Sequence, residues 1–302
     1  MTTTWRALIG GGVCLVLVAV LAANRTAIRR ALGTPAHLRI VFTGNTAGRL
    51  SACMCDGRLA GGLDYRQAAI AAITPPYVLL DTGNVGDGRT PADRERADAI
   101  LDRMRGMGYS AVNIGAAEAA LGLEWITGAS RRSIPLVSLN LMQGDAYAAE
   151  SHRVLECGGA SVLVTGILDP AYPVAAPLRI ENMTVALERL LARRAGEGTA
   201  QLPMVLLADL GRDAAADVAR RYPEIAVMLV CGRNDTIMPI VANRSVMAGI
   251  AGGRYMAELS MPWPERAGME VPDPESVLMR AIELLQPEGR MAPVLPAGIS
   301  VS

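Results

Sequence analysis

Cys53 and Cys55 flank Met54, and they are the residues whose type and spacing could most directly do chemistry. Thiolates are nucleophiles and ligands for soft metals, and neighbouring thiols also form disulfides. The spacing leaves three interpretations open: a disulfide within the pair or with another cysteine, free thiols, or a metal or redox site. We expect the other three cysteines to pack in apolar segments, at Cys14, Cys157 and Cys231.

A glycine-punctuated loop follows the first apolar segment after residue 36. Residues 38–42 predict a strand, residues 43–48 read Thr-Gly-Asn-Thr-Ala-Gly, and Gly61-Gly62 opens a predicted helix over 62–73. Glycines let the backbone approach a ligand closely, and α/β proteins bind ligands at the carboxyl ends of their strands. We therefore expect the functional site at this loop.

The histidine content limits the chemistry that this loop could support. The chain has two histidines, His37 before the first predicted strand and His152 in a predicted hairpin. A two-metal phosphoesterase needs several imidazoles and bridging carboxylates to hold its ions. No Ser-His-Asp set can be assembled near a glycine elbow either. We predict that both histidines are surface residues.

Apolar runs and helical patterns alternate between residues 37 and 261, which predicts a layered α/β domain. The predicted strands cover residues 38–42, 77–81, 111–114, 136–139, 161–167, 204–207 and 226–230. The predicted helices cover residues 62–73, 91–107, 116–127, 183–195 and 214–221. Glycine pairs predict hairpins over residues 152–167 and 245–259.

Five segments resemble, in this order, motifs of the metallophosphoesterase (calcineurin-like) domain of the 5'-nucleotidase and cyclic-phosphodiesterase family. They are the loop 43–48 with Gly61-Gly62, and the segments 79–84, 108–118, 206–211 and 231–235. The resemblance covers roughly residues 38–259 and implies an αββα sandwich. Some exported relatives carry a similar Cys-x-Cys in the first loop.

The positions that the resemblance assigns to metal ligands and to the catalytic histidine carry other residues. These are Asn45, Ala47, Asn84, Ala116, Ala117, Asp209, Arg233 and Asp235. Of the polar residues in the Gly-Asn-His-Glu motif, only Glu118 is retained. We therefore predict a degenerate site with no catalytic residue, no bound metal and no cofactor.

The substituted residues leave more than one interpretation of the pocket. If the fold is that of the family, Asn45, Asn84, Asp209 and Asp235 converge, and such oxygen donors can bind Ca²⁺ or Mg²⁺. Arg233 would stand in place of a cation and pair with Asp209 or Asp235. We favour a self-neutralised polar cluster, with an oxyanion or phosphate site and a remaining metal site as alternatives.

Charge and composition exclude some partners. The 302-residue chain has 29 basic and 29 acidic residues and no formal net charge, so no global field favours nucleic acid. All the basic residues are arginine, which we attribute to coding bias rather than to a binding surface.

The N-terminal segment carries the prediction of localisation. Residues 7–23 form an uncharged apolar run with Arg6 before it and Arg25, Arg29 and Arg30 after it. This length suits a short membrane helix or a long signal-peptide core, and we favour the uncleaved anchor. Because the family is mostly exported, we expect a single-pass inner-membrane protein whose soluble domain lies in the periplasm.

Prolines recur from residue 262 onward, which predicts an extended surface tail with one short helix over residues 275–285. The predicted organisation has three parts. Residues 1–36 form the membrane anchor (or signal segment) and a linker, residues 37–261 the metallophosphoesterase-like domain, and residues 262–302 the tail.

Two hypotheses of function follow. In the first, the protein is a membrane-anchored, catalytically inactive subunit that binds other membrane-protein subunits, with a photosynthetic or respiratory electron-transfer complex as the hypothesised assembly. In the second, it is an exported enzyme with residual phosphoesterase or thiol-based activity at Cys53 and Cys55. We favour the first because every assigned metal position is substituted.

Overall fold

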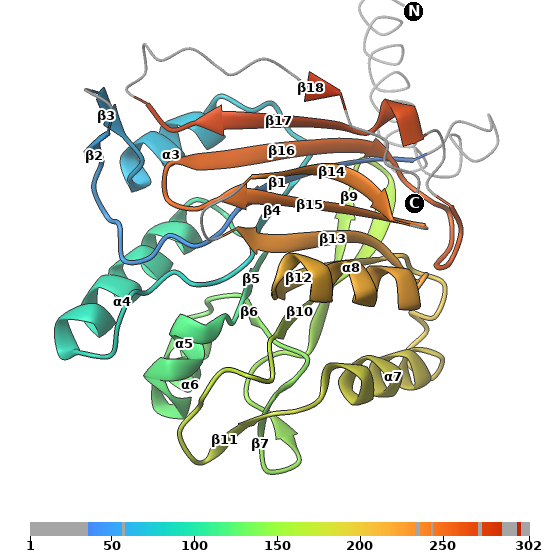
Figure 1. Cartoon of the computed structure of the whole chain (residues 1–302), viewed down its shortest axis with the longest axis horizontal. Coiled ribbons are helices and arrows are strands. Elements are labelled where there is room, and N and C mark those ends of the chain that lie inside the picture. Colours follow the sequence, from blue (N-terminus) through green and yellow to red (C-terminus); the bar gives the residue numbers. More distant parts are fainter. Residues whose placement is uncertain are drawn as a thin grey trace, which may run out of the picture.

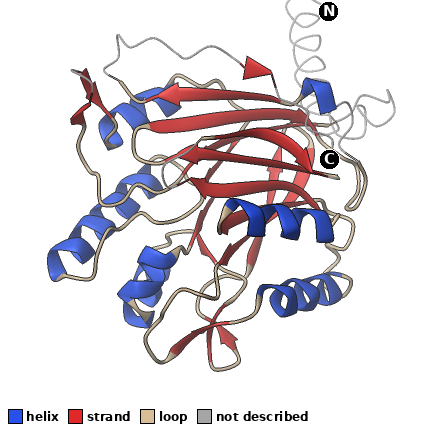
Figure 2. Cartoon of the chain, viewed as in Figure 1, coloured by secondary structure: helices blue, strands red, loops and turns tan. Residues whose placement is uncertain are grey.

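The computed structural model describes residues 36–55, 58–232, 236–242, 244–270, 274–285 and 295–296. The expected anchor at residues 7–23 lies outside these ranges, as do Arg233 and Asp235. Among the described helices, none is long and apolar enough to cross a membrane. Figure 1 and Figure 2 show two β-sheets with helices on their outer sides.

The first sheet has seven strands in the order β18-β17-β16-β1-β4-β5-β6. Strands β1, β4, β5 and β6 are parallel, and β16, β17 and β18 extend the sheet in antiparallel pairing. Their bounds are β1 His37–Thr43, β4 Val78–Asp81, β5 Ala111–Asn113, β6 Leu136–Val137, β16 Tyr255–Pro262, β17 Leu278–Glu283 and β18 Leu295–Pro296.

The second sheet has six strands in the order β14-β15-β13-β12-β10-β9. Its four inner strands are parallel, and an antiparallel strand lies at each edge. Their bounds are β9 His152–Cys157, β10 Ala160–Leu168, β12 Met204–Asp209, β13 Ile225–Gly232, β14 Ile237–Ala242 and β15 Ser245–Ala251. The predicted hairpin over residues 152–167 is confirmed as β9 and β10.

Six helices and two small sheets complete the elements of the described ranges. The helices are α3 Leu63–Ala71, α4 Pro91–Gly106, α5 Ala116–Leu121, α6 Leu123–Arg131, α7 Met183–Arg194 and α8 Arg212–Arg221, with a 3-10 turn η1 at Pro274–Ser276. The small sheets are β2 Cys53–Cys55 with β3 Arg58–Ala60, and β7 Leu141–Gln143 with β8 Ala146–Tyr147 and β11 Leu178–Ile180. The predicted helix over 116–127 is two helices, because Gly122 at φ 87° interrupts it.

Three apolar clusters arrange these elements in four layers. One cluster lies between the two sheets and takes residues from β1 and β16 on one side and from β10 and β15 on the other. A second packs α3, α4, α5 and α6 on the outer face of the seven-stranded sheet, and a third packs α7 and α8 on the six-stranded sheet. The α/β prediction is confirmed, and the layers follow the order helix, sheet, sheet, helix.

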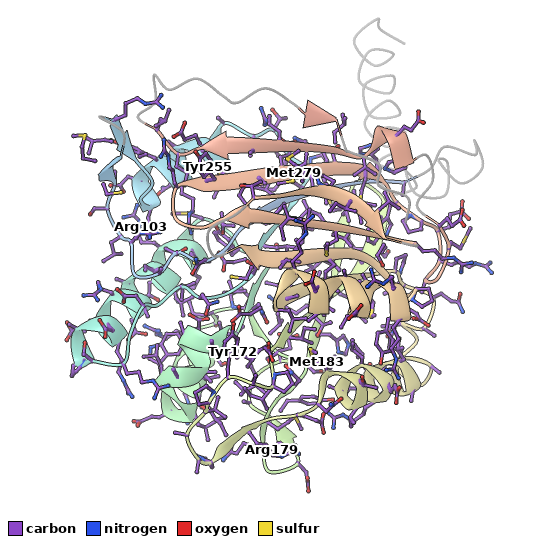
Figure 3. The ribbon with its side chains drawn as sticks, viewed as in Figure 1. Arg103, Tyr172, Arg179, Met183, Tyr255 and Met279 are labelled. Carbon is purple, nitrogen blue, oxygen red and sulfur yellow. The ribbon has the colours of Figure 1, made fainter. Side chains whose placement is uncertain are left out.

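The C-terminal segment corrects one prediction. The helix expected over residues 275–285 is instead η1 followed by β17, and β17 pairs with β16 in the main sheet. Met279 and Ile282 are buried, and Figure 3 labels Met279 on this strand. Their spacing of three suits a helix, but pairing with β16 satisfies the backbone of the segment while burying both side chains. The described part of residues 262–285 thus belongs to the domain rather than to a surface tail.

Trp263 also contradicts a surface tail. Its side chain is buried, and its Nε1 donates to the carbonyl oxygen of Ser161 at 3.1 Å. The indole therefore ties the end of β16 to β10 in the other sheet.

The hairpin expected over residues 245–259 is also wrong. β15 pairs with β13 and β14, whereas β16 pairs with β1 and β17, so the Gly252-Gly253 turn connects the two sheets. Val246 and Ile250 of β15 enter the central cluster from one side, and Ala257 and Leu259 of β16 enter it from the other. β15 and β16 lie in different sheets because the apolar faces of the two sheets then pack against each other.

Because β17 belongs to the core, we predict that substitutions at the neighbouring residues Leu278 and Met279 change stability by different amounts. Met279→Ala should lower the free energy of unfolding by roughly 2–5 kcal/mol, because it removes a buried side chain from the central core. Leu278→Ala, at a side chain that is 42% exposed, should change it by less than about 0.5 kcal/mol. Urea titration of the full-length protein measures both. Equal small losses would show that β17 is not part of the core.

Candidate functional site

The loops after β1 and β4 run side by side at the carboxyl ends of the parallel strands. The amides of Asn45, Ala47 and Gly48 donate to the carbonyl oxygens of Gly83, Asn84 and Val85 at 2.8, 3.0 and 2.8 Å. Asn45, Ala47 and Asn84 have φ of 47°, 48° and 59°. This left-handed conformation is unfavourable for residues with a Cβ, so the surrounding contacts must hold the loops in place.

Glu118 is the polar anchor of these loops. One carboxylate oxygen accepts from the amides of Asn84 (2.8 Å) and Gly115 (2.9 Å), and the other accepts from those of Val85 (2.8 Å) and Gly86 (3.2 Å). The side chain is fully buried. Burial raises the pKa of Glu118 to about 7, although the amide donors oppose this shift. Glu118 therefore has a structural role in which it joins the β4 loop to the start of α5.

The side chains of Asn84 and Asp209 point at the first amides of α5. Ala117 N donates to Asn84 Oδ1 at 2.9 Å, and Ala116 N donates to Asp209 Oδ2 at 2.8 Å. Against the larger effect of burial, the nearby side chain of Asn84 lowers the pKa of Asp209, and its Nδ2 donates to Cys231 Sγ at 3.5 Å. A side-chain oxygen at each of these two assigned metal positions thus accepts from the protein backbone.

Burial shifts the pKa values in this cluster. Desolvation raises the pKa of Asp209 above its ordinary value, although the amide of Ala116 and the side chain of Asn84 favour its ionised form. Burial, assisted by the nearby charge of Asp209, raises the pKa of the Cys231 thiol to about 12. Cys231 is therefore a thiol and not a nucleophilic thiolate at neutral pH.

A second buried polar network lies beneath the β1 loop. Thr43 Oγ1 donates to Asp81 Oδ2 at 2.5 Å and lies 2.8 Å from the hydroxyl of Tyr109. Arg66 from α3 is 1% exposed and donates to Thr46 Oγ1 at 2.9 Å. Burial raises the pKa of Asp81, and the Arg66 charge only partly offsets this effect. Arg66 thus supports the loop from its inner side.

An open cavity of about 570 Å³ lies over these loops. Five of the eight positions in the predicted degenerate site line it, namely Asn45, Ala47, Asn84, Ala116 and Ala117. Asp209 joins them through its hydrogen bond from Ala116 N, whereas Arg233 and Asp235 lie outside the described residues. The expected partnership of Arg233 with a carboxylate therefore stays a prediction.

The remaining candidate residues lie elsewhere. Cys53 is exposed on the β2–β3 hairpin and does not line the cavity, and the three interpretations of the Cys53 and Cys55 pair stay open. Cys157 and Cys231 are buried. His37 is exposed, and His152 is partly buried, where its Nε2 lies 3.5 Å from a Glu197 carboxylate oxygen. Neither histidine lines the cavity.

Sequence reasoning missed two arginines of the cavity wall. Arg49 directly follows Gly48 in the β1 loop, and Arg89 directly follows Gly88 in the β4 loop. A basic residue directly after a glycine in a strand-end loop indicates a candidate binding residue. Because we attributed all arginines to coding bias, we did not consider these two.

The described residues do not fit the metal pair that the resemblance implies. Ala47, Ala116 and Ala117 have no side chain that could bind a metal, and Asn84 Oδ1 and Asp209 Oδ2 accept from amides of α5. Within the described ranges, no three His, Cys, Asp or Glu side chains are grouped to hold a metal ion. We therefore derive no metal-dependent step for this site.

The burial of Glu118 predicts a specific pH dependence of stability. Its pKa is about 7 in the folded protein against an ordinary 4.5, so the folded state binds this proton more tightly. The stabilisation that this proton gives the folded state is complete below about pH 4.5 and is lost as the pH rises through about 7. The free energy of unfolding then falls by up to about 1.4 kcal/mol per pH unit. Urea titrations between pH 4.5 and 8 should show this decline.

Burial also raises the pKa values of Asp81 and Asp209, so these groups contribute to the same decline in stability. Two variants separate the contribution of Glu118 from theirs. Glu118→Gln should remove its share of the slope, whereas Glu124→Gln, at an exposed position of α6, should keep the wild-type profile. An unchanged slope in Glu118→Gln would contradict the assignment.

Comparison with known proteins gives the fold. No protein-family model and no curated protein matches the sequence. Among solved structures, the chain is similar to calcineurin-like phosphoesterase YfkN from Bacillus subtilis, with a TM-score of 0.65, 14% identity, and coverage of 83% of this chain and 91% of that one.

Longer proteins match over part of their length. The 5'-nucleotidase precursor from Thermus thermophilus has a TM-score of 0.64 and 18% identity, with coverage of 82% of this chain and 54% of that one. The sulfate thiohydrolase SoxB from Thermus thermophilus has a TM-score of 0.65 and 14% identity, with coverage of 82% and 57%. The chain thus spans about half the length of these two proteins. The chain has the fold that these calcineurin-like phosphoesterase and 5'-nucleotidase structures share.

Proposed function

We propose that this protein is a catalytically inactive member of the metallophosphoesterase fold that acts as a membrane-anchored binding or structural subunit. Its partners are other subunits of a membrane protein assembly, for which a photosynthetic or respiratory electron-transfer complex is our hypothesis. The soluble domain lies in the periplasm and is held at the inner membrane by residues 7–23.

One observation carries the proposal of inactivity. The amides of Ala116 and Ala117 donate to Asp209 Oδ2 and Asn84 Oδ1, and both of these side chains stand at assigned metal positions. A metal ion that took these two oxygens from the amides would leave buried N–H donors without partners, at a cost of about 1–3 kcal/mol for each lost hydrogen bond. Alanine at positions 47, 116 and 117 supplies no replacement ligand.

The fixed geometry of the site supports a binding role. Glu118 holds the β4 loop to α5, and Arg66 supports the β1 loop from beneath, so the cavity keeps a defined wall. A preorganised surface binds a partner with a smaller loss of conformational entropy than a mobile one. The apolar run at residues 7–23 would raise the effective concentration of this surface near other membrane subunits.

The purified protein should not hydrolyse nucleotides, cyclic nucleotides or aryl phosphates when Mn²⁺, Zn²⁺, Mg²⁺ or Ca²⁺ is added. The expected rate equals that of the buffer with the same metal, because the described site offers no free ligand set. Product release is measured with and without a chelator. Metal-dependent turnover that Asp209→Ala abolishes would overturn the proposal of inactivity.

Gentle detergent extraction tests the proposed assembly. The full-length protein, tagged at its C-terminus in its native membrane, should migrate on a native gel at a mass well above that of the 31.8 kDa chain and copurify with membrane subunits. A variant without residues 1–35 should retain the domain but lose this comigration. A lone monomer of the full-length protein in mild detergent would contradict the assembly.

A further inference from the structure

The cavity over the β1 and β4 loops carries a positive charge that the residues around it do not neutralise. Arg49 and Arg89 contribute to its wall from two different loops, and both are exposed. Within the described part of the chain, no hydrogen bond or ion pair engages either guanidinium. The one acidic residue of the lining, Asp87, accepts from Arg96 at 3.2 Å with both of its oxygens.

The side chain of Arg49 rests against a glycine turn. A Cβ on Gly253 would lie 2.3 Å from Arg49 Nη1 and 3.1 Å from its Cδ, so the guanidinium occupies the space that this glycine leaves free. Gly253 belongs to the connection between β15 and β16. The contact holds the charge at the cavity wall and lowers the entropy that a ligand would have to remove.

The buried acids near the cavity are engaged by donors. Glu118 accepts from four amides, and Asp209 accepts from Ala116 N and is contacted by Asn84. Asp81 lies deeper, where Arg66 provides an opposing charge. These acids reduce the potential of the cavity, but they offer no exposed oxygen to the two arginines. The accessible charge of the wall is therefore positive.

We propose that the cavity is a metal-independent binding site for a small molecule that carries a phosphate or carboxylate group, with Arg49 and Arg89 as its two charged donors. This inference rests on the proposed function, in which the site holds no metal. The cavity volume of about 570 Å³ lies within the usual range for small-molecule sites. Planar guanidinium groups donate paired hydrogen bonds to such oxyanions, which are stronger than neutral hydrogen bonds.

Isothermal titration of the full-length protein in detergent tests the site with two probes, inorganic phosphate and citrate, in a buffer that contains EDTA. We expect saturable binding of at least one probe, which weakens as the salt concentration rises. The double variant Arg49→Gln, Arg89→Gln should weaken that binding by at least about ten-fold, since each lost contact involves a charged hydrogen bond.

A matched control carries the same change in net charge away from the cavity. Arg131→Gln, Arg266→Gln removes two exposed arginines that do not line it and should bind the probe as the wild type does. The melting temperatures of both double variants verify that they are folded. If only phosphate binds, the site recognises a phosphate group, and if only citrate binds, it recognises carboxylates.

Three results would overturn the inference. They are no saturable binding of either probe, equal loss of binding in both double variants, and binding that appears only after a divalent metal is added. The first two leave the proposal of inactivity intact, because they say nothing about hydrolysis. Metal-dependent hydrolysis would instead remove the proposed function itself.

Discussion

The buried carboxylate of Glu118 is the constraint on which the site depends. Its two oxygens accept from four amides that belong to the β4 loop and to the residue before α5. A carboxylate has about four lone-pair positions, so these donors use its full accepting capacity. Removing them would leave buried carboxyl oxygens without partners, which is a costly change in a protein interior. The loops of the cavity therefore keep their shape without a ligand.

That shape explains how the other polar residues of the site are satisfied. With the start of α5 fixed by Glu118, the amides of Ala116 and Ala117 point at Asp209 and Asn84. The left-handed backbone at Asn45, Ala47 and Asn84 is retained although alanine and asparagine carry a conformational cost there. The described site thus combines a preserved loop geometry with side chains that bind the protein itself. Its open surface is left with the two arginines of the wall.

The sequence predicted the layers and the position of the site because both depend on local patterns. Apolar strands ending in glycine loops, such as residues 38–48, identified the carboxyl ends where Asn45 and Asn84 now line one cavity. Long-range pairing was harder to predict. The spacing of Met279 and Ile282 suits a helix, and only the position of β16 makes the segment a strand. The hydrogen bonds of Asp209 and Asn84 to backbone amides have no signature in residue types, so the sequence pointed to Arg233 instead.

The central claim is that Asp209 Oδ2 and Asn84 Oδ1 accept from the amides of α5 and that the described site binds no metal. The most direct measurement is a crystal structure of the protein grown with Mn²⁺, with data collected at a wavelength where manganese scatters anomalously. We predict no anomalous peak beside Asp209, and hydrogen bonds from Ala116 N to Asp209 and from Ala117 N to Asn84 near their present 2.8 and 2.9 Å. A manganese peak coordinated by Asp209 and Asn84, with α5 displaced, would contradict the account.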